Sequence, residues 1–325
     1  MCARYSVASE SPTYSVVVPV YRNEATLALL VERLRELAGE LDAPLEVVFV
    51  VDGSPDGSLV LLRRLLTEET AFSSQLIALS RNFGSFSAIR TGLAAAEGDL
   101  IAVMAADLQE PVSLVRKFFS ALATGEHDVA IGTRTSRGDP AGSARASRLF
   151  WWLYRRLVEK EIPPGGVDVF ACTHQVADQL VRLDESHTSL VGLVYWLGFR
   201  RVEVPYQRLP RPEGRSAWSF RRKVRYLLDS VFSFTDLPIT LIIALGALGV
   251  VVSTVSAMVV LAAWAAGQID VAGYTPLILA FFFMTSLILI ALGIVGSYVW
   301  RTYENSKRRP GAVPMSHERF GADGD

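Results

Sequence analysis

Short apolar runs alternate with longer amphipathic stretches through the first two thirds of the chain. The clearest amphipathic stretch is Ala25–Leu41, where leucine, valine and alanine recur every three or four residues, which is the spacing of a helix. Ser54-Pro55 and Glu110-Pro111 are typical of helix starts, because proline is tolerated in the first turn. The apolar runs are rich in β-branched residues and predict strands at Tyr14–Val20, Leu45–Val51, Leu76–Leu79, Leu100–Met104 and Asp128–Ile131.

Strands that are apolar throughout and alternate with helices predict an α/β domain. Its sheet should be mostly parallel and covered by helices on both faces. We expect this domain to span residues 14–218, after a flexible N-terminus at residues 1–13. Ligands of such sheets bind beyond the carboxyl ends of the strands. The residues that follow each strand are therefore the candidates for function.

The last third of the chain contains two long stretches without a charged residue. They are 33 residues from Leu237 to Ile269 and 30 residues from Val271 to Trp300. About 20 apolar residues are enough to cross the hydrocarbon core of a bilayer. The region 237–300 therefore predicts a hairpin of two transmembrane helices, at about 238–266 and 275–300. Two buried helices of a soluble core are the alternative, but such helices are rarely so long and so evenly apolar.

Basic residues flank this predicted hairpin on both sides and are absent from the loop between the spans. The positive-inside rule then predicts a multi-pass protein of the cell membrane with the N-terminal domain, both termini and a tail at 301–325 in the cytoplasm. Residues 219–236 carry basic side chains on one helical face and apolar ones on another, which predicts an interfacial helix. The flanking basic residues are Arg221, Arg222, Lys223 and Arg225 before the hairpin, and Arg301, Lys307, Arg308 and Arg309 after it.

Composition excludes several classes of protein. The 325 residues are half apolar and carry a net charge of −1, which does not favour a nucleic-acid-binding protein. Two cysteines cannot form a disulfide framework. The four histidines stand singly, so no zinc site of the His/Cys type is indicated.

Carboxylates and arginines follow the predicted strands in order. Carboxylates suit hydroxyl groups or a divalent cation, and arginines suit phosphate. A single Asp-Gly-Ser turn is commonly structural, but the ordered set predicts one ligand site. The segments are Pro19–Glu24, Asp52–Gly57, Arg81–Gly84, Ala105–Pro111 and Gly132–Arg134.

These motifs, read as VPVYRNE, VDGSPDG, SRNFG, AADLQEP and GTR, resemble the family 2 glycosyltransferases. More closely, the chain resembles the branch that glycosylates polyprenyl phosphate and carries two C-terminal spans, and the resemblance covers Ser15 to Trp300. It implies a GT-A (Rossmann-like) nucleotide-sugar-binding fold and a metal-dependent, inverting transfer of one sugar to undecaprenyl or dolichyl phosphate for cell-envelope glycosylation. A UDP-hexose such as UDP-glucose is the commonest donor of the family. Relatives with two spans further imply a homo-oligomer, with a tetramer suspected.

The resemblance also implies which residues bind the donor. The family holds the base and the ribose at positions matched here by Pro19, Tyr21, Glu24 and Asp52, and the same site includes Arg81, Ala106 and Asp107. Two of these assignments have alternatives, since Tyr21 could fill the core and Glu24 could be a helix-start carboxylate.

The expected cofactor is Mg²⁺ or Mn²⁺, held by Asp107 and Gln109 and serving to neutralise the leaving diphosphate. The family usually has Asp-x-Asp-x-Gln here, whereas this chain has Ala105 in the first place. Asp107 and Gln109 could suffice together with waters and diphosphate oxygens. Otherwise, metal affinity is weakened or the chain is a non-catalytic, donor-binding protein. A fourth reading makes Asp107 a helix cap before Pro111.

A lipid phosphate is anionic at pH 7, so it can attack without a general base, and it needs a cationic cradle instead. A processive polysaccharide synthase is a further alternative, but it normally needs more spans. Arg200–Arg225 is also strongly basic, which a membrane-facing flank would explain in part. The resemblance implies that Arg134 and Asp107 are the catalytic pair. It also implies that the acceptor phosphate is bound by Arg134, Arg145, Ser147, Arg148, Arg211, Arg215 and Ser216.

Overall fold

The structure of the chain is a computed structural model. It describes residues 13–134, 152, 155–156, 161–163, 167, 169–183, 189–209, 228–232, 235, 239–242, 244–248, 251, 255, 258–259, 262, 266, 274–307 and 309–321. The chain divides into two compact units. The first comprises residues 1–185, 189–223 and 310–325, and the second comprises residues 186–188 and 224–309.

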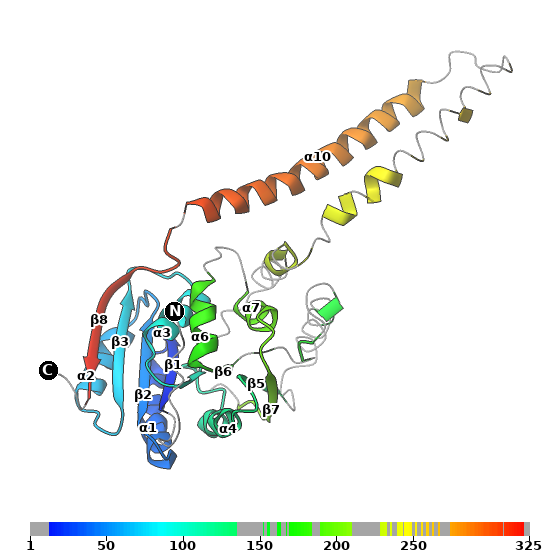
Figure 1. Ribbon diagram of the computed structural model, residues 1–325. Helices are drawn as coiled ribbons and strands as arrows, with labels where there is room; N and C mark the ends of the chain where they lie inside the picture. Colours follow the sequence, from blue (N-terminus) through cyan, green and yellow to red (C-terminus); the bar gives the residue numbers. More distant parts are fainter. Residues whose placement is uncertain are drawn as a thin grey trace. The chain divides into compact units, whose positions relative to one another are not determined.

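The first unit is built on one sheet, which has eight strands in the described residues, in the order β7-β5-β6-β4-β1-β2-β3-β8 (Figure 1). All strands run parallel except β6 and β8, which confirms the predicted α/β class and the mostly parallel sheet. The strands are β1 (Tyr14–Val20), β2 (Leu45–Val51), β3 (Ser73–Leu79), β4 (Leu100–Val103), β5 (Val129–Arg134), β6 (Phe170–Thr173), β7 (Arg201–Tyr206) and β8 (Pro314–Phe320).

Helices cover both faces of this sheet, which is why its central strands are mostly apolar (Figure 1). Helices α1 (Glu24–Glu40), α2 (Ser58–Thr67) and α4 (Val112–Ala123) lie on one face, and α3 (Ser85–Ala95) and α6 (His174–Arg182) lie on the other, with α7 (Leu190–Trp196) against α6. On the first face, the ring of Tyr14 in β1 stacks on Phe119 of α4 with centroids 4.6 Å apart. Strands β1 and β2 have the predicted bounds.

Helix α2 begins at Ser58, later than Ser54-Pro55 indicates. Helix α4 begins at Val112 with Pro111 as its N-cap, so its start at Glu110-Pro111 is confirmed. The polar residues before α2 form a turn instead of a helix. The Asp56 carboxylate accepts hydrogen bonds from the Ser54 hydroxyl (2.6 Å) and from the Ser58 amide (3.2 Å). Asp56 therefore supplies an acceptor for the first backbone amide of α2, which has no partner within the helix.

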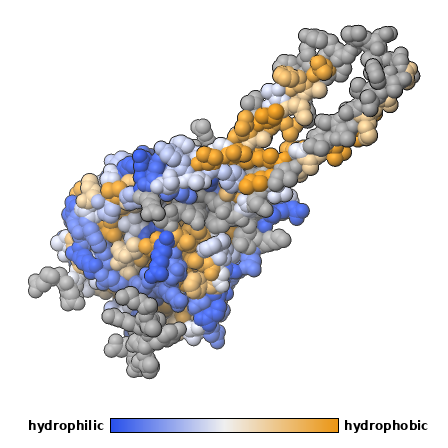
Figure 2. Space-filling model, turned by 45° about the horizontal axis from the view of Figure 1, so that its top comes forward, coloured by the Kyte–Doolittle hydropathy of each residue, from blue (hydrophilic) through white to orange (hydrophobic). Residues whose placement is uncertain are grey.

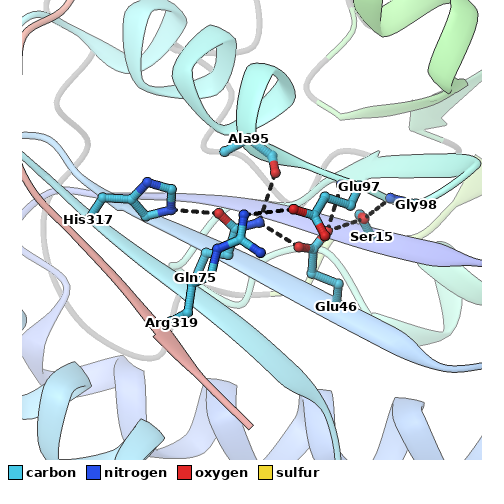
Figure 3. Close-up of polar contacts among 8 residues, drawn as sticks. All are labelled: Ser15, Glu46, Gln75, Ala95, Glu97, Gly98, His317 and Arg319. Carbon is cyan, nitrogen blue, oxygen red and sulfur yellow. Dashed lines mark hydrogen bonds and ion pairs between the residues drawn. The ribbon is translucent and has the colours of Figure 1, made fainter. Parts of the chain in front are cut away.

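The sequence pattern predicts only a tail at 301–325, whereas in the structure β8 pairs antiparallel with β3 at the edge of the sheet. Successive side chains of β8 make contacts on opposite faces of the sheet. Glu318 pairs with Arg63 of α2 at 2.6 Å, while His317 and Arg319 bond Gln75 (2.6 Å) and Glu97 (2.7 Å). Gln75 continues a buried polar chain through Glu46 to Ser15, at the end of the sheet opposite the predicted site (Figure 3). These specific bonds fix the register of β8 on β3.

In the second unit, helix α10 (Tyr274–Ser306) covers the predicted second span, and Figure 2 shows its apolar surface. Near its end, Arg301 forms a 2.7 Å ion pair with Asp229, and the guanidinium lies over the Phe232 ring. No helix within the described residues is both long enough and apolar enough to qualify as a membrane span. Most of the first span and of the interfacial helix at 219–236 lies outside the described residues, so the membrane hairpin stays a prediction.

Candidate active site

The carboxyl ends of the parallel strands meet along one edge of the sheet and carry the predicted site residues. Strand β1 lies between β2 and β4, so the loops that follow these three strands are neighbours. The backbone amide of Asp52 donates to the carbonyl of Val20 (2.9 Å), and that of Met104 donates to Val17 (3.0 Å). The structure thereby brings together the predicted donor segments after β1, β2 and β4. Pro19 lies within β1 itself.

Asp52 is buried, with 2% of its surface exposed. One carboxylate oxygen accepts a hydrogen bond from the amide of Phe83 (2.7 Å), and the other accepts one from the amide of Gly84 (2.9 Å). Two backbone bonds to a buried carboxylate hold the loop after β3 against the loop after β2. Asp52 lies among the predicted donor segments, and its carboxylate fixes the loop after β3.

Gly53 lies at a close approach between the same two loops. Its φ is +58°, and a Cβ there would lie 2.2 Å from the carbonyl carbon of Arg81. Only glycine fits both the conformation and the space. The Arg81 guanidinium lies over the ring of Phe83, 4.1 Å from its centroid, at the exposed surface of the loop. Arg81 is thus available to a phosphate beside the end of β3.

Tyr21 and Glu24 follow β1. Tyr21 is 37% exposed, which excludes its role as core filler and leaves its ring accessible for stacking. Glu24 begins α1, and its carboxylate accepts a 2.8 Å bond from the amide of Gly57. The amide of Glu24 in turn donates to Asp56 (3.3 Å). These bonds favour Glu24 as a structural carboxylate that joins the starts of α1 and α2.

The loop after β4 carries the predicted metal ligands. It is held from α1 by Thr26, whose hydroxyl donates a 2.7 Å bond to the carbonyl of Ala106. Leu108 has a φ of +57°, and the Asp107 carboxylate accepts a bond from the amide of Gln109 (3.3 Å). The turn is therefore fixed on both sides of Asp107.

The donor set of this loop fits Mg²⁺ or Mn²⁺ through Asp107, because Mg²⁺ commonly binds one or two carboxylates together with waters and substrate phosphates. The described residues contain no group of three His, Cys, Asp or Glu side chains able to hold a metal by themselves. Ala105 supplies no oxygen from its side chain, and the Gln109 side-chain oxygen accepts a hydrogen bond from Arg208. Among the described residues of this loop, Asp107 would accordingly be the principal protein ligand of such a cation.

Three residues near this turn are not predicted as site residues by the sequence motifs: Glu110, Tyr206 and Arg208. Arg134, the last residue of β5, is paired in register with Tyr206, the last residue of β7, and bonds its hydroxyl. Arg208 lies two residues further and bonds Gln109. Arg208 belongs to the basic block Arg200–Arg225, but only the pairing of β5 with β7 shows that it lies beside Arg134.

Glu110 is the buried acid of this cluster, with 4% of its surface exposed. Burial raises its pKa to about 7, the negative charge of Asp107 adds to the rise, and the charges of Arg208 and Arg134 oppose it. Burial also lowers the pKa of Arg134, as does the positive charge of Arg208. The cluster therefore places two guanidinium groups and two carboxyl groups close enough to interact. Perturbed groups of this kind are characteristic of functional sites.

Six predicted acceptor residues lie outside the described residues, and their assignment stays a prediction. They are Arg145, Ser147, Arg148, Arg211, Arg215 and Ser216.

Comparison with known proteins gives consistent matches along the chain. The family model "Glycosyl transferase family 2" matches residues 15–177. An uncharacterized glycosyltransferase of Synechocystis sp. is 31% identical over 297 residues, covering 91% of this chain and 92% of the relative. The uncharacterized glycosyltransferase YkcC of Bacillus subtilis is 30% identical over 298 residues, covering 91% of each chain. The undecaprenyl-phosphate 4-deoxy-4-formamido-L-arabinose transferase of Enterobacter sp. is 29% identical over 298 residues, covering 91% of this chain and 90% of the relative.

Proposed function

The chain belongs to glycosyl transferase family 2 and is a glycosyltransferase, and from this premise we propose that it transfers one sugar from a nucleotide sugar to a polyprenyl phosphate. The observation that carries the proposal is the cluster of Arg134, Arg208 and Asp107 at the carboxyl edge of the sheet. A cationic site beside a metal-binding carboxylate suits a reaction in which one phosphate attacks and another leaves. The relative named as an undecaprenyl-phosphate transferase supports the choice of acceptor.

The donor binds beside β1, β2 and β3 in this proposal. The exposed ring of Tyr21 stacks on the base, and the loop held by Asp52 presents Arg81 to the phosphates. Asp107 and, after release from Arg208, Gln109 would hold Mg²⁺ or Mn²⁺. When bound, such a cation neutralises charge on the leaving diphosphate. A UDP-hexose such as UDP-glucose is the donor we propose to test first.

The transfer is a single displacement at the anomeric carbon. A phosphate oxygen of the lipid forms the new bond to this carbon, and the bond from the carbon to the diphosphate oxygen breaks, so the electron pair leaves with the nucleoside diphosphate. Attack from the opposite face inverts the configuration. Since the attacking phosphate is already an anion, no side chain has to remove a proton. Arg134 holds the attacking phosphate close to the donor, and its planar guanidinium can bind two phosphate oxygens.

We place this reaction at the cytoplasmic face of the cell membrane, with the domain at 14–218 anchored by the hairpin at 237–300. The support is the chemistry of the acceptor, a membrane lipid, and the two uncharged stretches of 33 and 30 residues with basic flanks. A homo-oligomer, with a tetramer suspected, belongs to the same proposal.

The test uses the purified full chain in detergent with undecaprenyl phosphate. Nucleotide sugars are first screened with Mn²⁺ for thermal stabilisation, since a ligand that binds the folded state raises its stability. The stabilising sugar, radiolabelled, is then supplied with the lipid. An acid-labile lipid carrying one sugar is the expected product. A growing polymer indicates a processive synthase, and donor binding without any product indicates the non-catalytic protein that Ala105 leaves open.

A further inference from the structure

Two arginines lie at the carboxyl ends of adjacent parallel strands and interact with each other. Arg134 is the last residue of β5, and Arg208 follows the end of β7, the strand that pairs with β5. The positive charge of Arg208 is the second cause, after burial, of the lowered pKa of Arg134. Two guanidinium groups brought together repel each other, and the neighbouring carboxyl group of Glu110 offsets this only in part, because burial raises its pKa to about 7. An anion bound by both groups would offset the repulsion.

Neutral side chains orient both guanidinium groups. Arg208 donates from Nη2 to the side-chain oxygen of Gln109, and the amide of Leu209 donates to the Gln109 carbonyl at 2.8 Å. Arg134 bonds the hydroxyl of Tyr206. Bonds to an amide and a phenol fix the direction of a guanidinium without cancelling its charge. This differs from the described ion pair of Arg200 with Asp128, in which a carboxylate takes two guanidinium bonds of 2.8 and 2.9 Å.

Arg208 also retains unused hydrogen-bonding capacity. Its Nε atom is buried, yet within the described residues it has no hydrogen-bond partner. A buried N–H that has left water without gaining a partner is destabilising. A ligand oxygen beside Arg208 would satisfy it, and the side chain as a whole is only half-buried, so a ligand can approach.

We infer that Arg208 is a phosphate-binding residue that acts together with Arg134 on one phosphate group of the substrates. This inference rests on the proposed function and adds a residue to its site. The shared chemistry is a phosphate oxyanion, and it has two sources: the diphosphate of the nucleotide sugar and the phosphate of the lipid acceptor. Guanidinium groups suit both, because they bind phosphate oxygens in pairs.

The test compares Arg208→Met, Arg208→Lys and Arg208→Gln in the full-length protein. Arg319→Met is the matched control, since it removes the same charge from an exposed ion pair at the opposite end of the sheet. Thermal melting first establishes that each variant is folded. Binding of UDP with Mn²⁺ is measured by calorimetry, and binding of undecaprenyl phosphate by flotation with phosphatidylcholine vesicles that do or do not contain it.

The expected result is a loss of about 10- to 100-fold in affinity for one of the two probes in Arg208→Met, as for a charge-assisted hydrogen bond. Loss of UDP affinity assigns Arg208 to the leaving diphosphate, and loss of lipid affinity assigns it to the acceptor. Arg208→Lys should recover part of the loss. Arg208→Gln should recover little, because it keeps a donor toward Gln109 but no charge.

Salt dependence separates phosphate binding from a purely structural role. Removing a charge that contacts the phosphate should flatten the dependence of affinity on salt concentration, whereas Arg319→Met should leave it unchanged. The inference is overturned if Arg208→Met binds both probes as the wild type does, or if Arg208→Gln and Arg208→Lys behave alike with an unchanged salt dependence. Sugar transfer by the wild type is assayed in parallel, so failure of the proposed function is seen separately from failure at Arg208.

Discussion

The hydroxyl of Thr26 donates a 2.7 Å hydrogen bond to the carbonyl oxygen of Ala106, and this buried bond joins helix α1 to the loop that carries Asp107. Thr26 is 6% exposed and Ala106 is 2% exposed, so water cannot readily replace the bond. The residue before Asp107 is therefore held from the start of α1, beside the predicted donor site. The position of Asp107, the proposed metal ligand, thus depends on a side chain of a different element, helix α1.

Replacing Thr26 by valine tests this dependence. Thr26→Val keeps the shape of the side chain but leaves the buried carbonyl of Ala106 without its donor, which typically costs about 1–3 kcal/mol of stability. We expect a lower melting temperature and a weaker affinity for Mn²⁺ with UDP. Thr67→Val is the control, because the Thr67 hydroxyl bonds an exposed carbonyl, that of Arg63. Equal effects of the two substitutions would contradict the role given to Thr26.

Gly53 allows the approach of the loops after β2 and β3, and alanine should separate them. Gly53→Ala introduces a Cβ 2.2 Å from the Arg81 carbonyl carbon at a φ of +58°. Gly125→Ala separates the two effects, because Gly125 has a φ of +71° but open space around a Cβ. We expect about 1–2 kcal/mol of destabilisation from the backbone strain at residue 125. Overpacking should make the loss at residue 53 greater by about 1–3 kcal/mol.

The same two variants should differ in nucleotide binding. Displacing the loop after β3 breaks its bonds to Asp52, so Gly53→Ala should weaken binding of UDP measured by calorimetry. Gly125→Ala, in the turn after α4, should not. Wild-type affinity in a folded Gly53→Ala variant would show that the packing of these two loops does not matter for the donor.

The local sequence pattern predicts the bounds of the strands at the centre of the sheet, but it does not predict the strands at its edges. Strands β1 and β2 are buried on both faces, so continuous apolar runs mark their bounds. Strand β8 reads PMSHERF and has no such run, because its partners are polar side chains about 240 residues away, such as Gln75 for His317. A contact of this separation leaves no local periodicity, which is why the sequence indicated only a tail.

The order of the motifs predicted which strand ends carry the candidate site, but it did not show which hydrogen bonds each residue makes. Asp52 occupies the predicted place, yet its oxygens are used by the amides of Phe83 and Gly84. Arg208 becomes a candidate only once β7 is paired with β5, since 74 residues separate it from Arg134 in the chain. Residue type therefore predicts chemistry, whereas hydrogen-bond partners depend on the tertiary fold.

Asp107 should be essential for metal-dependent transfer. Asp107→Asn removes the charge that holds the cation, so turnover should fall by orders of magnitude while the protein still folds. Calorimetry with Mn²⁺ and UDP should show the matching loss of metal affinity. Activity that survives this change, or that EDTA does not affect, would remove Asp107 from its role.

Adding a carboxylate at residue 105 is the opposite change to removing the one at residue 107. Ala105→Asp introduces the carboxylate that the family usually has at this position, and we expect tighter Mn²⁺ binding with little change in maximal rate if Asp107 already suffices. Activity that is present only in Ala105→Asp would identify the natural chain as a non-catalytic, donor-binding protein.

The proposed topology is testable with cysteine labelling in intact cells. The natural background is small, because Cys172 is fully buried and burial raises its pKa to about 12, which keeps the thiol protonated, and Cys2 can be replaced. A cysteine in place of Gln268, in the loop between the predicted spans, should react with an impermeant maleimide. One in place of Ser306 should react only after permeabilisation. The reverse pattern would contradict the proposed cytoplasmic location of the domain.

Glu110 should make stability depend on pH in a defined direction. Its folded-state pKa is raised to about 7, from an ordinary value of 4.5, by burial and by the charge of Asp107. The folded state therefore holds a proton that the unfolded chain has already lost over this interval. The stability that this proton contributes is complete below pH 4.5 and is lost as the pH rises through 7.

Glu110→Gln should remove this dependence, because glutamine is neutral at every pH. The raised pKa corresponds to at most about 3 kcal/mol, so the variant should gain on the wild type by up to that amount between pH 5 and pH 8. Melting curves in EDTA measure the difference without a cation beside Asp107. Glu69→Gln is the control: burial acts to raise the pKa of Glu69, but bonds from Arg35 and backbone amides lower it overall. The difference in stability between Glu69→Gln and the wild type should then stay constant above pH 5. If the stability of Glu110→Gln ran parallel to that of the wild type across this pH range, the buried carboxyl of Glu110 would be ionised throughout.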